Sequence, residues 1–459
     1  MTIFNYQEAL DYLNNFTNYE KIPMPPANAT SLNLERVRRF LVRLGEPQRR
    51  YPSIVIAGTK GKGSTAILIN AALQAGGYRV GLYTQPHLHT YRERMQINGN
   101  LISREELAQL VTEMRPAIEK MLAEEAAEWG AITSYEVGTA LALLYFARQE
   151  VDIAVLEIGL GGRLDAVNVV EPLVSVIASL SLDHTAILGD TIEEIAFEKA
   201  GIIKPAIPVV TVPQWPGAEQ VLKQVSAERK ADLSFVTPAR LVEENIVLSP
   251  QNRRREHQKL LLQYGPASIA VQINLLGEHQ RLNAALAAAA LWQQQQQPGG
   301  LPLKAERLAE GFARAAWPAR MQTLQDEKGY PLIVADGAHN AESAERLREA
   351  LVENYYFEKL WLLTGIYQDK DVAGILRELA SAPRLAGLII TASRNPRAIQ
   401  PQKLAEIAGD QIPGMILKIS QNVKEGLELA RNLAGPLDLI CVTGSLSVAA
   451  EAEEYFQDQ

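Results

Sequence analysis

The chain has very little cysteine, few aromatic residues and no excess of basic residues. A single cysteine, Cys441, among 459 residues excludes an intrachain disulfide framework and a metal site built from several cysteines. It lies in an apolar run at residues 439–442, so we expect it in a core. The formal net charge of −8 gives no basic surface for binding phosphate backbones, and we expect no nucleic-acid partner. The basic run at residues 253–255 is interpreted as a solvated loop face.

Long apolar runs are also missing. No uninterrupted apolar segment approaches the roughly 18 residues of a membrane span, and the first residues show no charged-then-apolar signal pattern. We therefore expect a cytoplasmic protein with no membrane partner. The sequence has 47% hydrophobic and 21% charged residues over a length too great for one ordinary core. That composition indicates a globular protein of two or three domains.

Short apolar runs alternate with longer helical runs, which predicts a doubly wound, mostly parallel α/β sheet. The expected strands are residues 54–57, 80–83, 153–157, 174–178 and 208–212, and the expected helices are 6–16, 33–44, 66–75, 104–125 and 136–149. Beyond residue 230 the pattern is less regular, with strand candidates at 234–236, 246–248, 259–263 and 268–273, a helix at 283–292, and a glutamine run at 293–297 interpreted as a surface loop. A second α/β alternation begins at 331–335, so we place a domain boundary near Trp317.

Residues 53–65 carry the strongest functional pattern: a short apolar strand, a glycine-rich turn and a helical run. In such a turn, backbone N–H groups and the positive end of the helix bind a polyphosphate. Lys62 would neutralise phosphate oxygens, and Ser64 or Thr65 would offer a hydroxyl to Mg²⁺. The spacing is shorter than the usual phosphate-binding pattern, with only two residues between the first glycine and the Gly-Lys pair. A flexible glycine turn is the plainer alternative.

Polar residues follow other predicted strands. Ligands in open α/β sheets bind at the carboxyl ends of strands, so Glu157 is a candidate Mg²⁺ ligand, with a strand-end cap or salt bridge as the alternative. His184 is a candidate metal or phosphate contact, although a lone histidine is more often structural. Lys199 by itself is interpreted as a surface helix lysine. In the second alternation, the planar guanidinium of Arg320 suits a phosphate, and residues 336–340 place Asp, Gly, His and Asn after a strand.

Taken together, these segments resemble the folylpolyglutamate synthase/dihydrofolate synthase family, within the Mur ligase superfamily. The motifs that carry the resemblance occur in order at residues 58–64, 86–88, 93–94, 157–165, 182–185, 198–201, 279–284, 317–321, 336–340, 369–371 and 444–445. The resemblance implies an ATP-dependent amide ligase with a P-loop domain at residues 1–317 and a smaller Rossmann-like domain at 318–459. ATP would phosphorylate a carboxylate of a pteroate or folate. The amino group of L-glutamate would then attack the acyl phosphate and expel phosphate.

The resemblance also implies roles for individual residues. The positions that match ATP contacts are Thr59, Lys60, Gly61, Lys62, Gly63, Ser64, Asn283, Arg320 and Asp336. Those that match magnesium ligands, for two expected metal sites, are Ser64, Glu157, His184 and Gln85. Those that match the pterin or folate pocket are Ser31, Leu32, Asn33, Leu34, Thr133, Ser134, Tyr135, Glu136, Leu164, Asp165 and Ala166. Lys199 matches a lysine that is carbamoylated in the family and is expected to be catalytic with Lys62 and His184, while His339 is placed on the glutamate side.

This sequence departs from the family pattern beside the metal, because Gln85 stands where a serine usually helps to bind magnesium. The Gln85 amide oxygen, the Thr84 hydroxyl and water are the alternatives for that ligand position. Two other functions are considered: a Mur-type ligase acting on a nucleotide-linked cell-wall precursor, and a nucleotide-binding homologue without turnover. Residues 1–50 are too few for the uridine-nucleotide domain that the first of these would need. The family resemblance implies a monomer.

Overall fold

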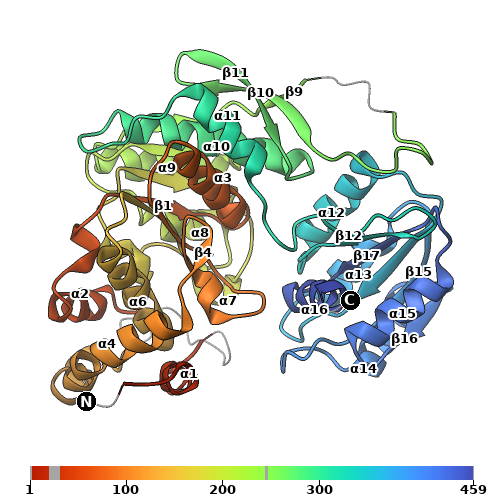
Figure 1. The fold of residues 1–459 in the computed structure, drawn as a ribbon, viewed down its shortest axis with the longest axis horizontal. Helices are drawn as coiled ribbons and strands as arrows, with labels where there is room; N and C mark the ends of the chain where they lie inside the picture. Colours follow the sequence, from red (N-terminus) through yellow and green to blue (C-terminus); the bar gives the residue numbers. More distant parts are fainter. Residues whose placement is uncertain (1–2, 20–31, 243–246, 458–459) are drawn as a thin grey trace. The chain divides into compact units, whose positions relative to one another are not determined.

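The computed structural model describes residues 3–19, 32–242 and 247–457, and its chain divides into two compact units. The larger unit comprises Met1–Leu241, Leu260–Gln272 and Arg281–Ala315. The smaller unit comprises Val242–Lys259, Ile273–Gln280 and Ala316–Gln459. Figure 1 shows both as ribbons. The domain boundary after residue 317 stays a prediction. Within the described ranges, no helix is both long enough and apolar enough to cross a membrane.

The larger unit is built on an eight-stranded sheet with the order β4-β3-β2-β5-β1-β6-β7-β8. The strands are β1 Ser53–Ala57, β2 Val80–Tyr83, β3 Met95–Ile97, β4 Asn100–Leu101, β5 Ile153–Glu157, β6 Val174–Ile177, β7 Val209–Thr211 and β8 Leu233–Phe235. All pairs from β2 to β8 are parallel, whereas β3 and β4 form an antiparallel edge. A second, three-stranded sheet contains β9 Arg240–Leu241, β10 Gln258–Tyr264 and β11 Ala267–Ile273. The predicted fold class is confirmed.

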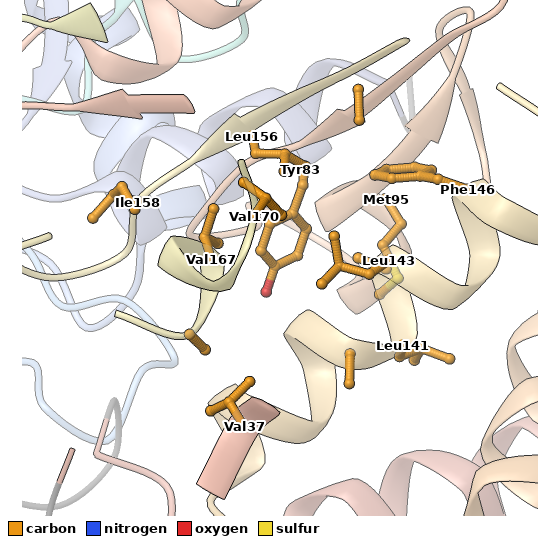
Figure 2. Close-up of a cluster of buried hydrophobic side chains, with 14 of the residues drawn as sticks. Val37, Tyr83, Met95, Leu141, Leu143, Phe146, Leu156, Ile158, Val167 and Val170 are labelled. Carbon is orange, nitrogen blue, oxygen red and sulfur yellow. The ribbon is translucent and has the colours of Figure 1, made fainter. Parts of the chain in front are cut away.

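Every residue of β1, β2, β5 and β6 is buried, which explains why these strands are continuous apolar runs. Helices supply the other side chains of this core, and Figure 2 shows part of it around Tyr83, Phe146 and Leu156. The helices before Ala316 are α1 Tyr6–Asn14, α2 Leu34–Arg43, α3 Lys62–Ala75, α4 Arg104–Glu124, α5 Ala126–Trp129, α6 Ser134–Arg148, α7 Thr185–Leu188, α8 Ile192–Ala200, α9 Pro216–Glu228, α10 Glu278–Gln295 and α11 Ala305–Arg314. Of these, α1, α2, α4, α6, α8 and α9 supply buried side chains to this core. The short 3-10 turns are η1 Pro47–Arg49, η2 Tyr91–Arg94 and η3 Ala166–Val169.

The smaller unit has a six-stranded sheet with the order β12-β13-β17-β14-β15-β16, parallel except for the edge strand β12. Its strands are β12 Gln322–Gln325, β13 Leu332–Ala335, β14 Leu360–Thr364, β15 Leu385–Ile390, β16 Leu417–Ile419 and β17 Leu439–Thr443. Its helices are α12 Ala341–Asn354, α13 Val372–Ala380, α14 Pro401–Gln411, α15 Val423–Leu433 and α16 Leu446–Gln457. Cys441 lies in β17 and is fully buried, which confirms its expected place in a core.

Three predictions about the irregular middle of the chain are wrong. Residues 247 and 248 belong to no strand, and residue 246 lies outside the described residues. The glutamine run is not a surface loop at its start, because α10 continues to Gln295 and the buried Gln294 side chain bonds both backbone groups of Leu301. Glutamine is a good helix former, so nothing ends the helix at residue 292. Arg253 is not solvated: its side chain is 11% exposed and donates to Asp326 and to three backbone carbonyls.

Candidate active site

Four neighbouring parallel strands of the larger unit, in the order β2, β5, β1 and β6, end at the same edge of the sheet. Gln85 follows β2, Glu157 ends β5, the glycine-rich loop 58–61 follows β1, and Asp183 follows β6. Glu157 is the register partner of Ile56 in β1, so its carboxylate lies beside the start of that loop. Adjacent strands are about 4.8 Å apart. The sheet therefore gathers residues from four separate segments of the chain.

The glycine-rich loop has the geometry of a phosphate-binding turn. Gly58 and Gly61 have φ angles of +150° and +85°, and a Cβ on Gly61 would lie 2.3 Å from Oδ1 of Asn283 in α10. No side chain caps the N-terminus of α3 within the described residues, which leaves its first N–H groups available to an anion. The structure thus brings Asn283, expected to contact ATP, against the loop expected at the phosphates.

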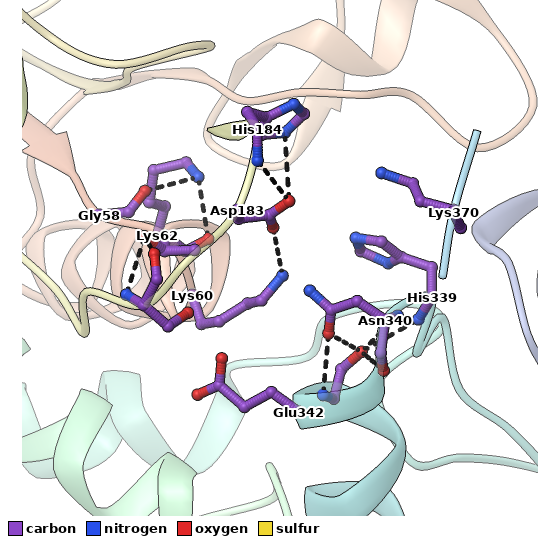
Figure 3. A network of polar contacts seen from close by, with 12 residues as sticks. Gly58, Lys60, Lys62, Asp183, His184, His339, Asn340, Glu342 and Lys370 are labelled. Carbon is purple, nitrogen blue, oxygen red and sulfur yellow. Dashed lines mark hydrogen bonds and ion pairs between the residues drawn. The ribbon is translucent and has the colours of Figure 1, made fainter. Parts of the chain in front are cut away.

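Loop residues are fixed to the segment that follows β6. The N–H groups of Thr59 and Lys60 both donate to the carbonyl of Ser179, at 2.9 and 3.1 Å. The Lys60 ammonium lies 2.8 Å from Oδ2 of Asp183, and Figure 3 shows this ion pair. The Thr59 hydroxyl donates to the Ser181 carbonyl at 3.1 Å. Hydrogen bonds and one ion pair therefore join the loop that follows β1 to the segment that follows β6.

Two ammonium groups converge on the carbonyl oxygen of Gly58. Lys62 Nζ donates to it at 3.0 Å and Lys199 Nζ donates to it at 3.1 Å. Lys199 is 4% exposed, so its interpretation as a surface lysine is wrong. Lys199 points from α8 to the loop that follows β1, a burial that the helical pattern alone does not show. Burial and the nearby charge of Lys62 lower the pKa of Lys199 to about 7, because both disfavour its cationic form. At neutral pH a large share of its amine is unprotonated and nucleophilic.

Oxygen donors suited to Mg²⁺ lie at this edge. Ser64 and Glu157 are 5% and 4% exposed, and the Thr65 hydroxyl at the start of α3 is buried with no hydrogen-bond partner among the described residues. No cluster of three or more His, Cys, Asp or Glu in the described part of the chain is arranged to hold a metal alone. A hydroxyl and a carboxylate fit a Mg²⁺ ion that keeps several waters and binds substrate phosphates. His184 precedes α7 with φ +53° and a side chain that is 48% exposed.

Tyr135 and Asp165, both matched to the pterin pocket, are joined to this edge through Gln85. The Gln85 amide nitrogen donates to the Tyr135 hydroxyl at 2.9 Å, and that hydroxyl donates to Asp165 Oδ1 at 2.9 Å. The Gln85 backbone N–H donates to Glu157 at 3.3 Å. Burial raises the pKa of the Asp165 carboxyl, although backbone N–H groups partly offset the shift.

The other pterin-pocket segments are held together by a buried ion pair. The guanidinium of Arg36, which is 0% exposed, donates to both carboxylate oxygens of Glu136 at 2.6 to 3.2 Å. Asn33 caps α2 by accepting from two backbone N–H groups, and Thr133 caps α6 by accepting from the Glu136 N–H. Leu32, Leu34, Ser134 and Leu164 are partly buried and Ala166 is buried, whereas Ser31 lies outside the described residues. Asn33, Thr133 and Glu136 thus each form hydrogen bonds that stabilise the protein itself.

A cavity of about 320 Å³ opens beside Tyr135. Its lining includes Tyr6, His87, Tyr91, Arg94 and Tyr135. Arg94 is 4% exposed, donates from Nε to His87 Nδ1 at 2.9 Å, and lies over the Tyr91 ring. The wall is therefore aromatic with a buried cation, a combination that suits a planar, carboxylate-bearing molecule.

In the smaller unit, Arg320, Asp336 and His339 cluster at the end of β13. Asp336 accepts from the backbone N–H groups of Met321 and Ala338, each at 2.9 Å, and burial raises the pKa of its carboxyl. A Cβ on residue 337 would lie 2.7 Å from Nη1 of Arg320, so a side chain at this position would displace the guanidinium. His339 Nδ1 lies 2.8 Å from the Gly337 carbonyl, and Asn340 caps α12.

Sequence reasoning missed three partners in these sites. Asp183 lies in the motif at residues 182–185 and has no predicted role there, although an acidic residue after a strand is a signal for the Lys60 ion pair. Gln85 was predicted only as a possible magnesium ligand, and its bond to Tyr135 was missed. Arg36 gave no signal, because it sits among other charged residues of α2 that are exposed.

Comparison with known proteins identifies the same regions. The Mur ligase middle domain matches residues 56–291, and the Mur ligase glutamate ligase domain matches residues 319–446. The chain is 35% identical to the dihydrofolate synthase/folylpolyglutamate synthase of Bacillus subtilis, over 90% of this chain and 92% of that protein. Mycobacterium tuberculosis folylpolyglutamate synthase, solved with ADP and AMPPCP, superposes with a TM-score of 0.82 at 32% identity, covering 92% of this chain and 95% of that one. Escherichia coli FolC, solved with DHPP and ADP, gives a TM-score of 0.82 at 28% identity, covering 99% and 98%.

Proposed function

The chain belongs to the folylpolyglutamate synthase/dihydrofolate synthase family of Mur ligases, and from that premise we propose that it joins L-glutamate to a folate or dihydropteroate carboxylate with consumption of ATP. The observation that carries the proposal is the loop 58–61, with its uncapped α3 N-terminus and Lys62 beside the Glu157 strand end. These groups are a polyphosphate site placed next to a carboxylate that suits magnesium. Relatives solved with ADP support the nucleotide part.

The reaction proceeds in two transfers. The acceptor carboxylate attacks the terminal phosphorus of ATP, ADP leaves, and an acyl phosphate forms. The amine of glutamate then attacks the acyl carbon, phosphate leaves, and the amine loses a proton as the amide forms. Catalysis of such transfers depends on positioning and charge neutralisation. Lys62 and the α3 N–H groups hold phosphate oxygens in this scheme, and Arg320 and Asp336 are proposed as further contacts to ATP.

Magnesium would supply further neutralisation of phosphate charge when bound through Ser64 and Glu157, with His184 as the proposed ligand of a second ion. Lys199 is the proposed site of carbamoylation: its unprotonated amine adds to CO₂, forming an N–C bond and releasing one proton. Its lowered pKa and its place 3.1 Å from the Gly58 carbonyl support this. Carbon-13 NMR under labelled CO₂ should show a carbamate signal that Lys199→Arg lacks. Absence of the signal in the native chain would contradict the modification.

The acceptor is proposed to bind in the cavity beside Tyr135, since its tyrosines and buried Arg94 suit rings and carboxylates. His339 is proposed to contact the incoming glutamate. We further propose that the chain acts as a monomer in the cytoplasm, where ATP is supplied.

An ADP-release assay tests the proposal. Dihydropteroate and tetrahydrofolate are compared side by side, each with and without L-glutamate, and release should require both glutamate and an acceptor. ATP binding without turnover on either acceptor would sink the proposal, and turnover on cell-wall precursors instead would favour the Mur-type alternative. Lys62→Ala should abolish turnover while the fold persists, whereas Lys223→Ala, an exposed helix lysine, should act like the native chain. Near-normal kinetics in Lys62→Ala would show that the phosphate assignment is wrong.

A further inference from the structure

Gln85 contacts two parts of the larger unit. One is the end of β5, on the proposed magnesium side, and the other is the wall of the cavity proposed for the acceptor. Its backbone N–H donates to the Glu157 carboxylate, on the metal side of the site. Its side-chain amide donates to the hydroxyl of Tyr135, which forms part of the wall of the 320 Å³ cavity. One residue therefore contacts both the carboxylate at the end of β5 and the cavity wall on α6.

Hydrogen bonding fixes which end of the Gln85 amide faces Tyr135. The tyrosine hydroxyl has one proton, and it donates that proton to Asp165 at 2.9 Å. It must accept from Gln85, so the amide nitrogen points toward it. The hydroxyl also accepts from the Gly159 N–H at 3.2 Å. The Tyr135 hydroxyl is thereby held by one acceptor and two donors.

Asp165 is saturated by its own neighbourhood. Its two carboxylate oxygens accept from the N–H groups of Gly159, Leu160 and Val167 and from Tyr135. A carboxylate has about four acceptor positions, so all of them are occupied. Asp165 therefore acts here as an anchor for Tyr135 and for the loop after β5.

Gly159 shows how closely these groups pack. A Cβ at this position would lie 2.8 Å from the Tyr135 hydroxyl and 3.0 Å from Nε2 of Gln85. Both side chains lie directly on the backbone of the loop that leaves Glu157. Movement of any one of the three displaces the others.

We propose that Gln85 is a positioning residue for the acceptor: through the Tyr135 hydroxyl it sets the cavity wall relative to the Glu157 carboxylate. The side chain serves the acceptor pocket and is not required as a magnesium ligand. The proposal rests on the proposed function, since it names the acceptor as the molecule that fills the cavity. It gives Gln85, which stands where a serine is usual in the family, a role in binding the acceptor.

The expected effects are modest and specific. A neutral hydrogen bond contributes about 0.5–1.5 kcal/mol, which corresponds to a change of about 2- to 12-fold in an equilibrium constant. Gln85→Ala and Tyr135→Phe should each raise the KM for the acceptor by a factor in that range. Both should leave the KM for ATP and the Mg²⁺ concentration for half-maximal activity unchanged. Because both variants break the same link, Gln85→Ala/Tyr135→Phe should be no worse than the more impaired single variant.

Tyr6→Phe provides the matched control, because Tyr6 lines the same cavity but its hydroxyl bonds Thr90. Its effect should add to that of Gln85→Ala. Calorimetric titration of dihydropteroate into each variant with ADP present gives a second readout that does not depend on turnover. Thermal unfolding checks that all variants fold.

Three results would overturn the proposal: an unchanged acceptor KM and affinity in Gln85→Ala, additive effects of Gln85→Ala and Tyr135→Phe, or a raised Mg²⁺ requirement in Gln85→Ala. A native chain without acceptor-dependent ADP release would instead overturn the proposed function. The two failures are therefore distinguishable.

Discussion

Replacing Gly61 by alanine should weaken nucleotide binding by an amount that follows from the structure. Gly61 has φ +85°, a conformation that costs an alanine about 1–2 kcal/mol. Its new Cβ would lie 2.3 Å from Oδ1 of Asn283, about 1 Å inside an ordinary contact of 3.4 Å. The loop or Asn283 must move by that distance, and a 1 Å displacement in a preorganised site costs about 100-fold in rate. We expect kcat/KM for ATP to fall by about that factor.

Gly77→Ala separates the backbone cost from the clash. Gly77 has φ +91° with no atom within 4 Å of a built Cβ, so its alanine meets the same backbone cost in open space. It should lose about 1–2 kcal/mol of unfolding free energy and keep its nucleotide affinity. Steady-state kinetics with ATP, titration with a fluorescent ATP analogue and thermal unfolding of both variants make the comparison.

Equal nucleotide affinity in Gly61→Ala and Gly77→Ala would refute this reasoning. The pair Gly61→Ala/Asn283→Ala gives a further check, since removing the amide empties the space that the new Cβ enters. Gly61→Ala should therefore weaken nucleotide binding less in the Asn283→Ala background than in the native chain. If the two losses add in full, the clash is not the cause.

Other predictions concern buried charge. Arg36→Met should destabilise the chain by about 3–5 kcal/mol in chemical unfolding, because it leaves the Glu136 carboxylate buried without its cation. The double variant Arg36→Met/Glu136→Leu should recover most of that loss. No recovery would contradict the assignment of a buried ion pair. Folded Lys199 releases its proton near pH 7 while the unfolded lysine keeps it to its ordinary pKa of 10.5, so unfolding free energy should rise with pH between these values by up to about 1.4 kcal/mol per unit in CO₂-free buffer. Lys199→Met should lack that contribution, and identical slopes in both proteins would exclude it. Arg253→Ala should cost about 1–3 kcal/mol because its guanidinium is buried, whereas Arg394→Ala, 70% exposed, should cost under about 1 kcal/mol in the same urea titration.

The parallel sheets were predictable because burial on both faces makes each strand a continuous apolar run. The predicted strands 80–83 and 153–157 agree with β2 and β5 at both ends. Residues 247 and 248 were mistaken for part of a strand because a short apolar run carries no information about its pairing partner. The glutamine run was mistaken for a loop because composition cannot show that Gln294 has an internal partner.

The candidate site was predictable where chemistry is local. A glycine-rich turn between a strand and a helix can be recognised from the sequence alone, and the structure confirms its local geometry. Burial of Lys199 and Arg36 was not predictable, because it depends on which helix face meets the sheet or α6. The partner of Gln85 was equally hidden, since Tyr135 is fifty positions away in sequence.

The gathering of strand ends at one edge has a consequence for how this chain tolerates change. Gln85 and Glu157 are joined by a crossover of about seventy residues that includes α4 and α6, yet they lie at the ends of the adjacent strands β2 and β5. Their separation is set by the hydrogen-bonded ladder and not by the length of the connection. A change of length in an exposed segment of that crossover is therefore expected to leave Gln85 and Glu157 side by side, because the β2–β5 ladder fixes their spacing.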